Sequence, residues 1–358
     1  MKIAILTLPF HANYGGVLQA YALQTVLQRM GHEVVVIDKD MFHHRSWFRQ
    51  QLSFSAYIVR KYLLGKECEY SNSYKADHDK KAVEKNIRSF INKHLNILTV
   101  KDLAKDFPRD TDAVVVGSDQ VWRPKYFTWA YGCGIENAYL SFLDEPAIKK
   151  VSFAASFGTE KWEYSDKETD ICSYFLKRFY AVSVRESSGV RLCQERLGRT
   201  DVEQMPDPAF LLTKNDYRSL FERKDDPVHY LLYYVLDETE DSITKAETIA
   251  KNRGLTIKRI NGDIDNPSIP ISKRIKAPVE EWLRGVANAD FVFTDSFHAC
   301  VFSIIFEKPF VSIGNHNRGM DRFNSLSALF RLDDNTSVLN EQRERAFRFL
   351  SKALDCKQ

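Results

Sequence analysis

The feature that most constrains this chain is its opening, where a short apolar run, a turn, a helical segment and a second apolar run follow one another. Residues 2–8 are rich in Ile and Leu and short enough for a buried parallel strand. Residues 9–16 break the chain with Pro, Asn and two Gly. Residues 17–30 place apolar side chains at helical spacing, and Gly31 suits the end of that helix. With the β-branched run 33–38, the pattern predicts a right-handed βαβ unit.

The same alternation continues through the first half of the chain. Residues 112–116, 150–155 and 180–184 are short apolar runs with helical segments between them. This repetition predicts an α/β fold with a doubly wound parallel sheet. Residues 41–100 are polar, aromatic and mostly helical in pattern, so we expect an insertion that covers the sheet.

A segment rich in chain-breaking residues, MPDP at 205–208, predicts the joint between a first domain, 1–204, and a second, 205–358. Predicted strands and helices again alternate in the second domain, and we expect that its last helix could pack back on the first domain. Two Rossmann-like domains with parallel sheets would leave a cleft between the carboxyl ends of their strands, where ligands bind in such folds. Strands are predicted at 229–236, 256–260, 290–294 and 309–313, and helices at 241–253, at 278–289, from 301 onward and at 340–356.

Charge and cysteine content exclude several classes of protein. Lys and Arg number 51 and Asp and Glu 48, a net +3, whereas nucleic-acid-binding domains carry a strong basic excess. We expect no signal peptide and no transmembrane segment, because no apolar stretch approaches the roughly 20 residues that span a membrane. The six cysteines include no CxxC pair, which predicts no metal site and reduced thiols in a cytoplasmic protein.

The loop after the first strand contains Asn13, Gly15 and Gly16 at the start of a helix. Two glycines there let backbone N–H groups approach an anion, and the helix dipole favours negative charge. These residues are therefore candidates for substrate binding. The alternative is a tight turn in which Asn13 caps the helix.

The loop after strand 112–116 contains Ser118, Asp119, Gln120 and Trp122. Asp119 could act as a base or orient a hydroxyl, and Trp122 could stack on a sugar, with Ser118 and Gln120 beside them. The alternative is an N-capping Asp119 and a packed Trp122.

Arg185 follows the predicted strand at 180–184, and a guanidinium there suits a carboxylate or a phosphate. The alternative is a structural salt bridge to Glu186 or Asp207.

The loop after strand 290–294 brings Asp295, Ser296 and His298 to a helix N-terminus. There His298 is a candidate general acid or a donor to an anion. Cys300 lies in an apolar helix start, which is typical of a buried, inert thiol. Residues 314–322, with Arg318 and Arg322, could hold a phosphate or form a solvated surface loop.

Taken together, five segments of this chain resemble the polysaccharide pyruvyl transferase family. No one of them is diagnostic, but their order over most of the chain is specific. They are NYGGVLQAYALQ at 13–24, VVVGSDQVW at 114–122, SVRESSG at 183–189, PDPAFLL at 206–212 and TDSFHACVFSIIFEKPF at 294–310.

The resemblance implies a two-domain arrangement like that of GT-B glycosyltransferases. It also implies transfer of a pyruvyl group from phosphoenolpyruvate to two hydroxyls of a sugar in a cell-surface glycan or its precursor, without a further cofactor. His298 matches the family's histidine for donor binding and acid chemistry, Arg185 matches its arginine, and Asp119 falls in the acceptor site. A lipid-linked acceptor would place the protein at the inner face of the membrane. The sequence leaves the sugar, its carrier and the oligomeric state open.

One position departs from the family pattern, because Ser296 stands where some better-known members have an arginine two residues before the histidine. The missing charge would then come from Lys308, Arg318 or Arg322, which with Arg185 would gather positive charge at the cleft. Two other functions remain open at this level. One is a GT-B glycosyltransferase that uses a nucleotide sugar, and the other is a glycan-binding protein without catalysis.

Overall fold

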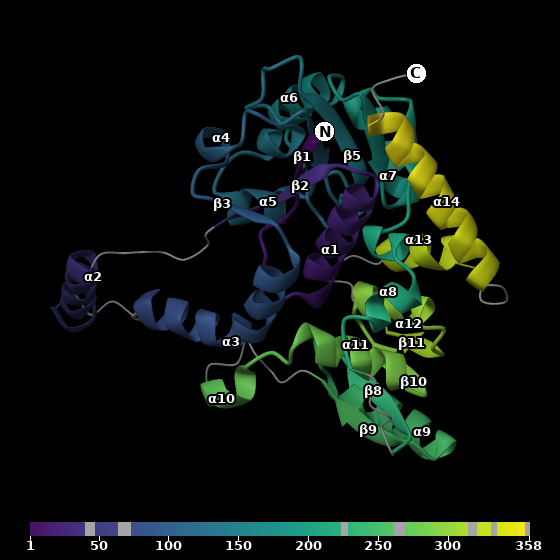
Figure 1. The fold of residues 1–358 in the computed structure, drawn as a ribbon. Helices are drawn as coiled ribbons and strands as arrows, with labels where there is room; N and C mark the ends of the chain where they lie inside the picture. Colours follow the sequence, from purple (N-terminus) through teal and green to yellow (C-terminus); the bar gives the residue numbers. More distant parts are fainter. Residues whose placement is uncertain are drawn as a thin grey trace.

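A computed structural model of the protein describes residues 1–39, 47–63, 73–222, 228–260, 269–313, 321–330 and 335–354. It contains two parallel β-sheets with helices packed around them (Figure 1). The predicted α/β class with two parallel sheets is therefore confirmed.

The first sheet has seven strands, all parallel to their neighbours. The first strand of the chain, β1, lies inside this sheet and pairs with β2 on one side and β4 on the other, so the chain winds outward in both directions from this point. In spatial order the strands are β3 (Ile97–Val100), β2 (Glu33–Lys39), β1 (Lys2–Leu6), β4 (Ala113–Val116), β5 (Lys149–Ala155), β6 (Ala181–Val184) and β7 (Val202–Gln204).

Helices cover both faces of this sheet because alternate strand residues point to opposite sides. Ile3 and Ile5 of β1 face a core shared with α1 (Tyr14–Arg29), α3 (Ser73–His94) and α14 (Asn335–Leu354). Ala4 and Leu6 face the other core. That second core is closed by α4 (Leu103–Asp106), α5 (Pro124–Tyr131), the 3₁₀ turn η2 (Ile135–Tyr139), α6 (Asp166–Leu176) and α7 (Ser187–Leu197).

Two parts of the first half differ from the sequence-based expectation. Residues 41–100 are not only an insertion, because β3 at their end pairs with β2 and forms the edge of the sheet. The short strand β7 at the opposite edge was not predicted. The described part of the insertion otherwise consists of α2 (Trp47–Ile58), the π-helical turn η1 (Val59–Leu63) and α3.

The second sheet has four parallel strands, in the order β11 (Phe310–Ser312), β10 (Phe291–Thr294), β8 (Tyr230–Tyr234) and β9 (Thr256–Arg259). One face packs on α9 (Glu240–Arg253) and the other on α11 (Val279–Asn288) and α12 (Phe297–Ile305). Helix α12 begins at Phe297, four residues before the predicted start, because Ser296 caps it. The remaining elements are η3 (Pro208–Leu211), α8 (Lys214–Arg218), α10 (Ile271–Arg274) and α13 (Asp321–Leu329).

The two sheets share one continuous core. The Tyr14 ring stacks on Trp282 at 5.2 Å between centroids, and the Tyr14 hydroxyl donates to the Ala277 carbonyl at 2.8 Å. Helix α14 also returns to the first sheet, where Phe349 meets Phe153. Strands β1–β7 all precede residue 205 and β8–β11 all follow it, but the division into two domains at that residue stays a prediction.

Candidate active site

The candidate site lies where the carboxyl ends of the two sheets meet. In each sheet the winding direction reverses between two adjacent strands, β1 and β4 in the first and β10 and β8 in the second. Ligands in open α/β sheets bind at such switch points. The loops after β1 and β4 carry Gly15 and Asp119, and the loop after β10 leads to His298. The predicted candidates therefore converge from three separate loops.

Gly15 of α1 packs directly against His298 of α12, across the two halves of the molecule. A Cβ atom at Gly15 would lie 2.0 Å from both Cγ and Nδ1 of the His298 ring, so no other residue type fits here without displacing the imidazole. Asn13 caps α1 by accepting a hydrogen bond from the Gly15 N–H at 3.1 Å, as in the capping alternative. The N-termini of α1 and α12 thus meet at one point, and both present the positive end of a helix dipole.

Arg185 is the centre of a buried network rather than a free cation. Its Nη1 donates to Asp207 Oδ2 at 2.9 Å and its Nε to Glu186 Oε1 at 3.0 Å, so both salt bridges of the structural alternative are present. Its other donors reach the hydroxyls of Ser118 at 3.3 Å and Ser156 at 3.0 Å. Burial disfavours its charge, but Glu186 and Asp207 outweigh burial and raise its pKa above the ordinary value.

His298 completes this network from the other half of the molecule. Its Nε2 lies 3.5 Å from Asp207 Oδ2, too far for a well-formed hydrogen bond, and makes no hydrogen bond to any described residue. Burial by itself would raise the pKa of Asp207, but His298 and Arg185 overcome it and hold that pKa well below its usual range. Asp207 is therefore a carboxylate that faces both a guanidinium and an imidazole.

Asp119 adopts a strained backbone conformation at the end of β4. Its φ is +68°, in the left-handed region that residues other than glycine rarely occupy. Its Oδ1 accepts from the Gln120 N–H at 2.9 Å, and its Oδ2 lies 3.4 Å from where a Cβ on Gly16 would be. Asp119 is thus not a helix cap, and its carboxylate faces the start of α1.

The predicted gathering of positive charge at this site is not found among the described residues. Arg185 is surrounded by the carboxylates of Asp119, Glu186 and Asp207. Lys308 lies at the amino-terminal ends of the strands of the second sheet, away from the site, where Asp290 precedes β10 and Lys308 precedes β11. Sequence proximity to His298 was misleading here, since a whole helix separates the two residues.

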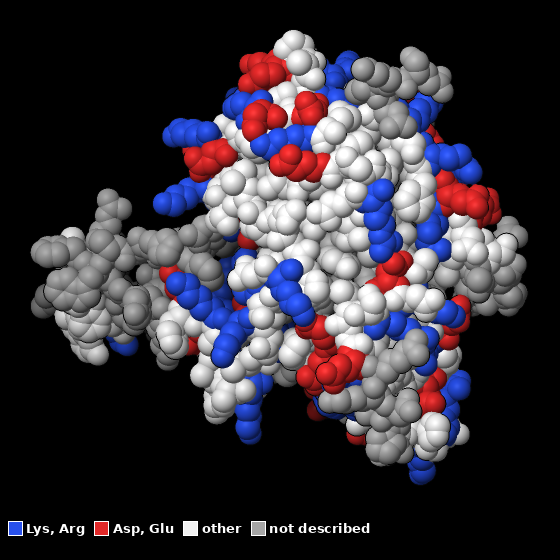
Figure 2. Space-filling model, viewed as in Figure 1, with Lys and Arg blue, Asp and Glu red and all other residues white. Residues whose placement is uncertain are grey.

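The other two predicted cations cannot be assigned to the site. Arg318 lies outside the described residues, and Arg322 falls in α13, with its side chain outside the described part. Figure 2 shows basic and acidic side chains interspersed over the visible face, in keeping with the net charge of +3.

Three further candidates have structural contacts. Trp122 is fully buried and stacks on Tyr139, so the packing alternative holds and no sugar can reach its ring in this structure. Gln120 accepts a hydrogen bond from Arg123 Nη1 at 3.0 Å. Asp295 uses both carboxylate oxygens to accept the N–H groups of Leu236 and Asp237, at 2.7 and 3.0 Å, and so ties the loop after β10 to the loop after β8.

Two residues beside the site have structural roles, of which only that of Cys300 was predicted. Ser296 caps α12 through its hydroxyl, 3.5 Å from the Ala299 N–H. Cys300 is fully buried, and burial raises the pKa of its thiol to about 12, which agrees with an inert thiol.

Sequence reasoning missed Asp207 as a member of the site. It was considered only as a salt-bridge partner of Arg185, and its segment was interpreted as a joint between domains. A signal was present, because Asp207 is the second residue of PDPAFLL, one of the five family-like segments. Its contacts to Arg185, Ser118 and His298 join residues 22, 89 and 91 positions apart, which no local pattern reveals.

The site is closed in this structure. Asp119, Arg185, Asp207, Ser296 and His298 are each no more than 8% exposed. A surface cavity of about 370 Å³ lies elsewhere, between α3 and α11. Within the described ranges, no group of three or more His, Cys, Asp and Glu side chains could hold a metal ion, and no helix is long and apolar enough to cross a membrane.

Comparison with known proteins gives a family and a set of similar folds. The family model described as polysaccharide pyruvyl transferase matches residues 13–317. A search of curated proteins finds no match. Among solved structures, a putative UDP-N-acetylglucosamine 2-epimerase from Listeria monocytogenes is similar with 9% identity and a TM-score of 0.49, covering 98% of this chain and 95% of that one. An α-glucosyltransferase in complex with UDP and a 13-mer DNA is similar with 12% identity and a TM-score of 0.43, covering 99% and 96%.

Proposed function

Because the chain belongs to the polysaccharide pyruvyl transferase family, we propose that it transfers the pyruvyl group of phosphoenolpyruvate to two hydroxyls of one sugar, forming a pyruvate ketal and releasing phosphate. The observation that supports this reaction most directly is the His298–Asp207 pair. It offers a buried imidazole nitrogen, held against a carboxylate, at the meeting point of two helix N-termini. The acceptor is a sugar of a cell-surface glycan or its precursor.

The reaction requires a proton donor and a proton acceptor. The methylene carbon of the donor gains one proton and becomes a methyl group, while C2 forms bonds to two sugar oxygens and loses its bond to the phosphate oxygen. The two hydroxyl protons are thereby accounted for, one on the methyl group and one on the released phosphate. An acid and a base at fixed positions lower the barrier for these transfers.

We assign the acid to His298. Its Nε2 lies near Asp207 and makes no hydrogen bond within the described part of the chain, so this nitrogen can donate a proton to a bound donor substrate. Asp207 is a positioning residue, because its carboxylate faces the imidazole and fixes its direction, as carboxylates do for catalytic histidines. Arg185 in turn holds Asp207.

We assign the base to Asp119. Its carboxylate faces Gly16 of α1, next to the Gly15 position that His298 faces, and the Gln120 N–H holds its other oxygen. A sugar hydroxyl between the two groups could lose its proton to Asp119 while His298 acts on the donor. The N-termini of α1 and α12 provide the positive potential that an anionic donor requires.

Thermal shift measures the donor specificity directly, since a ligand that binds the native state raises its melting temperature. We expect phosphoenolpyruvate to stabilise the protein and UDP and GDP to have no effect. Stabilisation by UDP or GDP without phosphoenolpyruvate would instead identify a nucleotide-sugar glycosyltransferase. Absence of any shift with all three would point to a protein without this chemistry.

Replacement of His298 tests the mechanism. We expect His298→Ala to lower turnover by roughly 100- to 10,000-fold, the usual contribution of a general acid, while the protein stays folded. His229→Ala is the matched control and should leave turnover unchanged. His229 is exposed and pairs with Asp290 at the amino-terminal ends of β8 and β10, away from the site. Full activity of His298→Ala would refute the assignment.

A further inference from the structure

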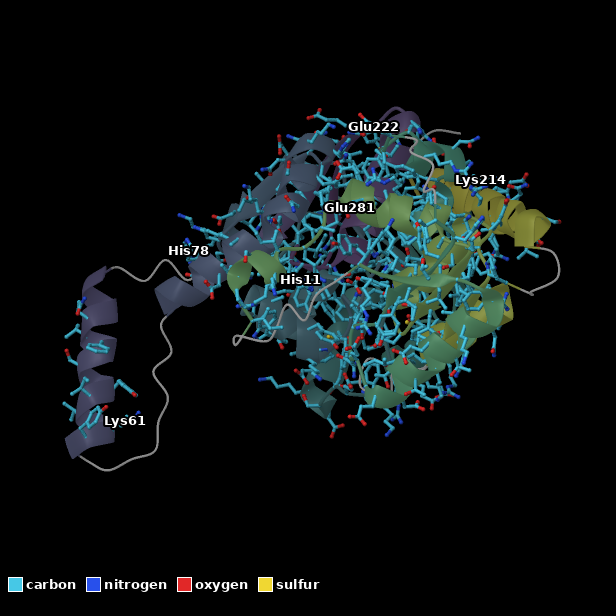
Figure 3. The ribbon with its side chains drawn as sticks, turned by 90° about the horizontal axis from the view of Figure 1, so that it is seen from below. His11, Lys61, His78, Lys214, Glu222 and Glu281 are labelled. Atoms are coloured by element: carbon cyan, nitrogen blue, oxygen red, sulfur yellow. The ribbon has the colours of Figure 1, made fainter. Side chains whose placement is uncertain are left out.

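Helix α2 and turn η1, residues 47–63, form a separate element of this molecule. Both ribbon views show α2 standing clear of the two sheets and their covering helices (Figures 1 and 3). We call residues 47–63 the outer helix. The outer helix therefore does not pack against the core of the molecule.

The outer helix exposes large apolar side chains. Leu52, Phe54, Ile58, Val59 and Tyr62 are between 37% and 70% exposed. At 100° per residue, Leu52, Phe54 and Ile58 of α2 fall within an arc of about 160°, the width of an apolar face, and Val59 and Tyr62 follow in the π-helical turn η1. Contiguous exposed apolar surface of this kind is typical of an interaction site.

The charge of this segment is one-sided. Residues 41–66 contain five basic residues and no Asp or Glu, whereas 48 acidic residues in 358 would place three or four in a stretch of this length. Three of the basic residues, Arg49, Arg60 and Lys61, belong to the outer helix, and Figure 3 shows Lys61 at its far end. The rest of the chain carries mixed charge, so this positive segment is a local feature.

We propose that the outer helix lies in the surface of an anionic lipid membrane, with its apolar face among the acyl chains and its basic residues at the headgroups. A helix with one aromatic and aliphatic face and with Lys and Arg elsewhere binds in this way, parallel to the surface. The sequence WFRQQLSFSAYIVRKYL has this composition, including the Trp and Tyr residues that prefer the interface. The absence of acidic residues selects an anionic surface over a neutral one.

Vesicle co-sedimentation of the full chain tests this proposal without any substrate. We expect binding to vesicles of phosphatidylglycerol and phosphatidylethanolamine, weakening as salt is added, and much weaker binding to phosphatidylcholine vesicles. Arg60→Gln and Lys61→Gln should each weaken binding roughly fivefold. No binding of the wild-type chain to anionic vesicles would overturn the proposal.

The double variant Leu52→Glu/Val59→Glu tests the apolar face, and we expect it to weaken binding by at least about tenfold. Its matched control is Trp129→Glu/Tyr174→Glu, which adds the same charge at side chains 73% and 62% exposed on α5 and α6 and should bind like the wild type. Equal loss in both double variants would show a general charge effect and refute the assignment to this helix.

Size-exclusion chromatography on the same variants separates a lipid surface from a second copy of the chain. We expect the wild type and Leu52→Glu/Val59→Glu to elute at the same size, with unchanged melting temperatures. A wild-type dimer that dissociates in this variant, together with unaltered vesicle binding, would instead assign the face to self-association. Because none of these readouts depends on phosphoenolpyruvate, the proposal can fail while the proposed reaction stands, and the reverse.

Discussion

At the scale of single residues, the site depends on a glycine that admits a histidine. Gly15 belongs to the first half of the chain and His298 to the second, and the ring occupies the space that a side chain on Gly15 would take. The two glycines of this loop were predicted to bind an anion through their N–H groups. The structure shows a second and stricter requirement for glycine at position 15, because a side chain there would overlap the His298 ring.

Gly15→Ala should therefore displace His298 and lower turnover by roughly 100-fold, the cost of moving a catalytic group by about 1 Å. Stability should fall as well, by about 1–3 kcal/mol, because the added Cβ would also lie 2.6 Å from the His298 Cβ and so overpacks a buried site. Steady-state kinetics and thermal unfolding measure the two effects.

Gly16→Ala is the control for this change. Its Cβ would lie 3.2 Å from Asn13 Nδ2 and 3.4 Å from Asp119 Oδ2, contacts that small side-chain shifts relieve. We expect it to retain most of the activity, and a loss equal to that of Gly15→Ala would contradict the proposed contact with His298.

A second prediction at this scale concerns pH. Asp207→Asn removes a buried carboxylate from between Arg185 and His298 and should cost about 3 kcal/mol at neutral pH. The depressed pKa of Asp207 stabilises the fold above its unfolded pKa of about 3.9, and this contribution is lost as pH falls through the native pKa. The difference in unfolding free energy between wild type and Asp207→Asn should thus shrink below about pH 4.

Urea unfolding of both proteins across this pH range provides the measurement. A difference that stays constant or grows on acidification would show that the charge of Asp207 is not what stabilises this network.

At the scale of elements, loops between strands and helices carry the site, and their roles divide between chemistry and support. The loop after β10 was predicted to bring Asp295, Ser296 and His298 to a helix N-terminus, and it does. Asp295, however, points its carboxylate at the loop after β8. Its closest role is to fix the start of α12, and so the position of His298.

Asp295→Ala should leave two backbone N–H groups without their acceptor and destabilise the protein by about 3 kcal/mol. Ser296→Ala, which removes a single long cap contact, should cost less than about 1 kcal/mol. Chemical denaturation measures both. If Asp295→Ala kept full stability but raised the KM for the donor, Asp295 would be a substrate contact instead.

Edge strands show the limit of element prediction. Strands β1, β2, β4, β5 and β8 are apolar runs and were predicted to within a few residues. Strand β7 has three residues and one buried side chain, and β3 has four residues and one buried side chain. Neither segment stands out as a run of buried side chains, and pairing with β6 and β2 defines them as strands. Edge position alone does not prevent prediction, because the short edge strands β9 and β11 of the second sheet were predicted at 256–260 and 309–313.

At the scale of the whole molecule, the two sheets are joined through the first residue of α1. Tyr14 stacks on Trp282 and donates to Ala277, inside the core that both sheets share. The same arrangement brings Gly15 against His298. Assembly of the site and cohesion of the two halves therefore depend on the same few contacts.

Tyr14→Ala should lower the free energy of unfolding by about 3–5 kcal/mol and separate the unfolding of the two halves, because it opens a cavity at their joint. Tyr14→Phe keeps the ring and should cost about 1 kcal/mol for the lost hydrogen bond, with one transition preserved. Differential scanning calorimetry distinguishes these outcomes. A single transition at the wild-type temperature in Tyr14→Ala would show that other contacts hold the halves together.

The sequence by itself determined the α/β class, the two series of parallel strands, the loops that bear the candidate residues and the family. These features follow from the local spacing of apolar residues and from the polar residues that come directly after apolar runs. Both are patterns among neighbouring positions in the sequence. The packing of the two sheets shows that Arg185 pairs with Glu186 and Asp207 and that Asp207 meets His298. It also shows that Lys308 lies at the amino-terminal ends of the second sheet's strands and that Trp122 is buried against Tyr139. Each of these depends on contacts between residues distant in the chain, and their geometry is set by how two sheets pack, not by any segment alone.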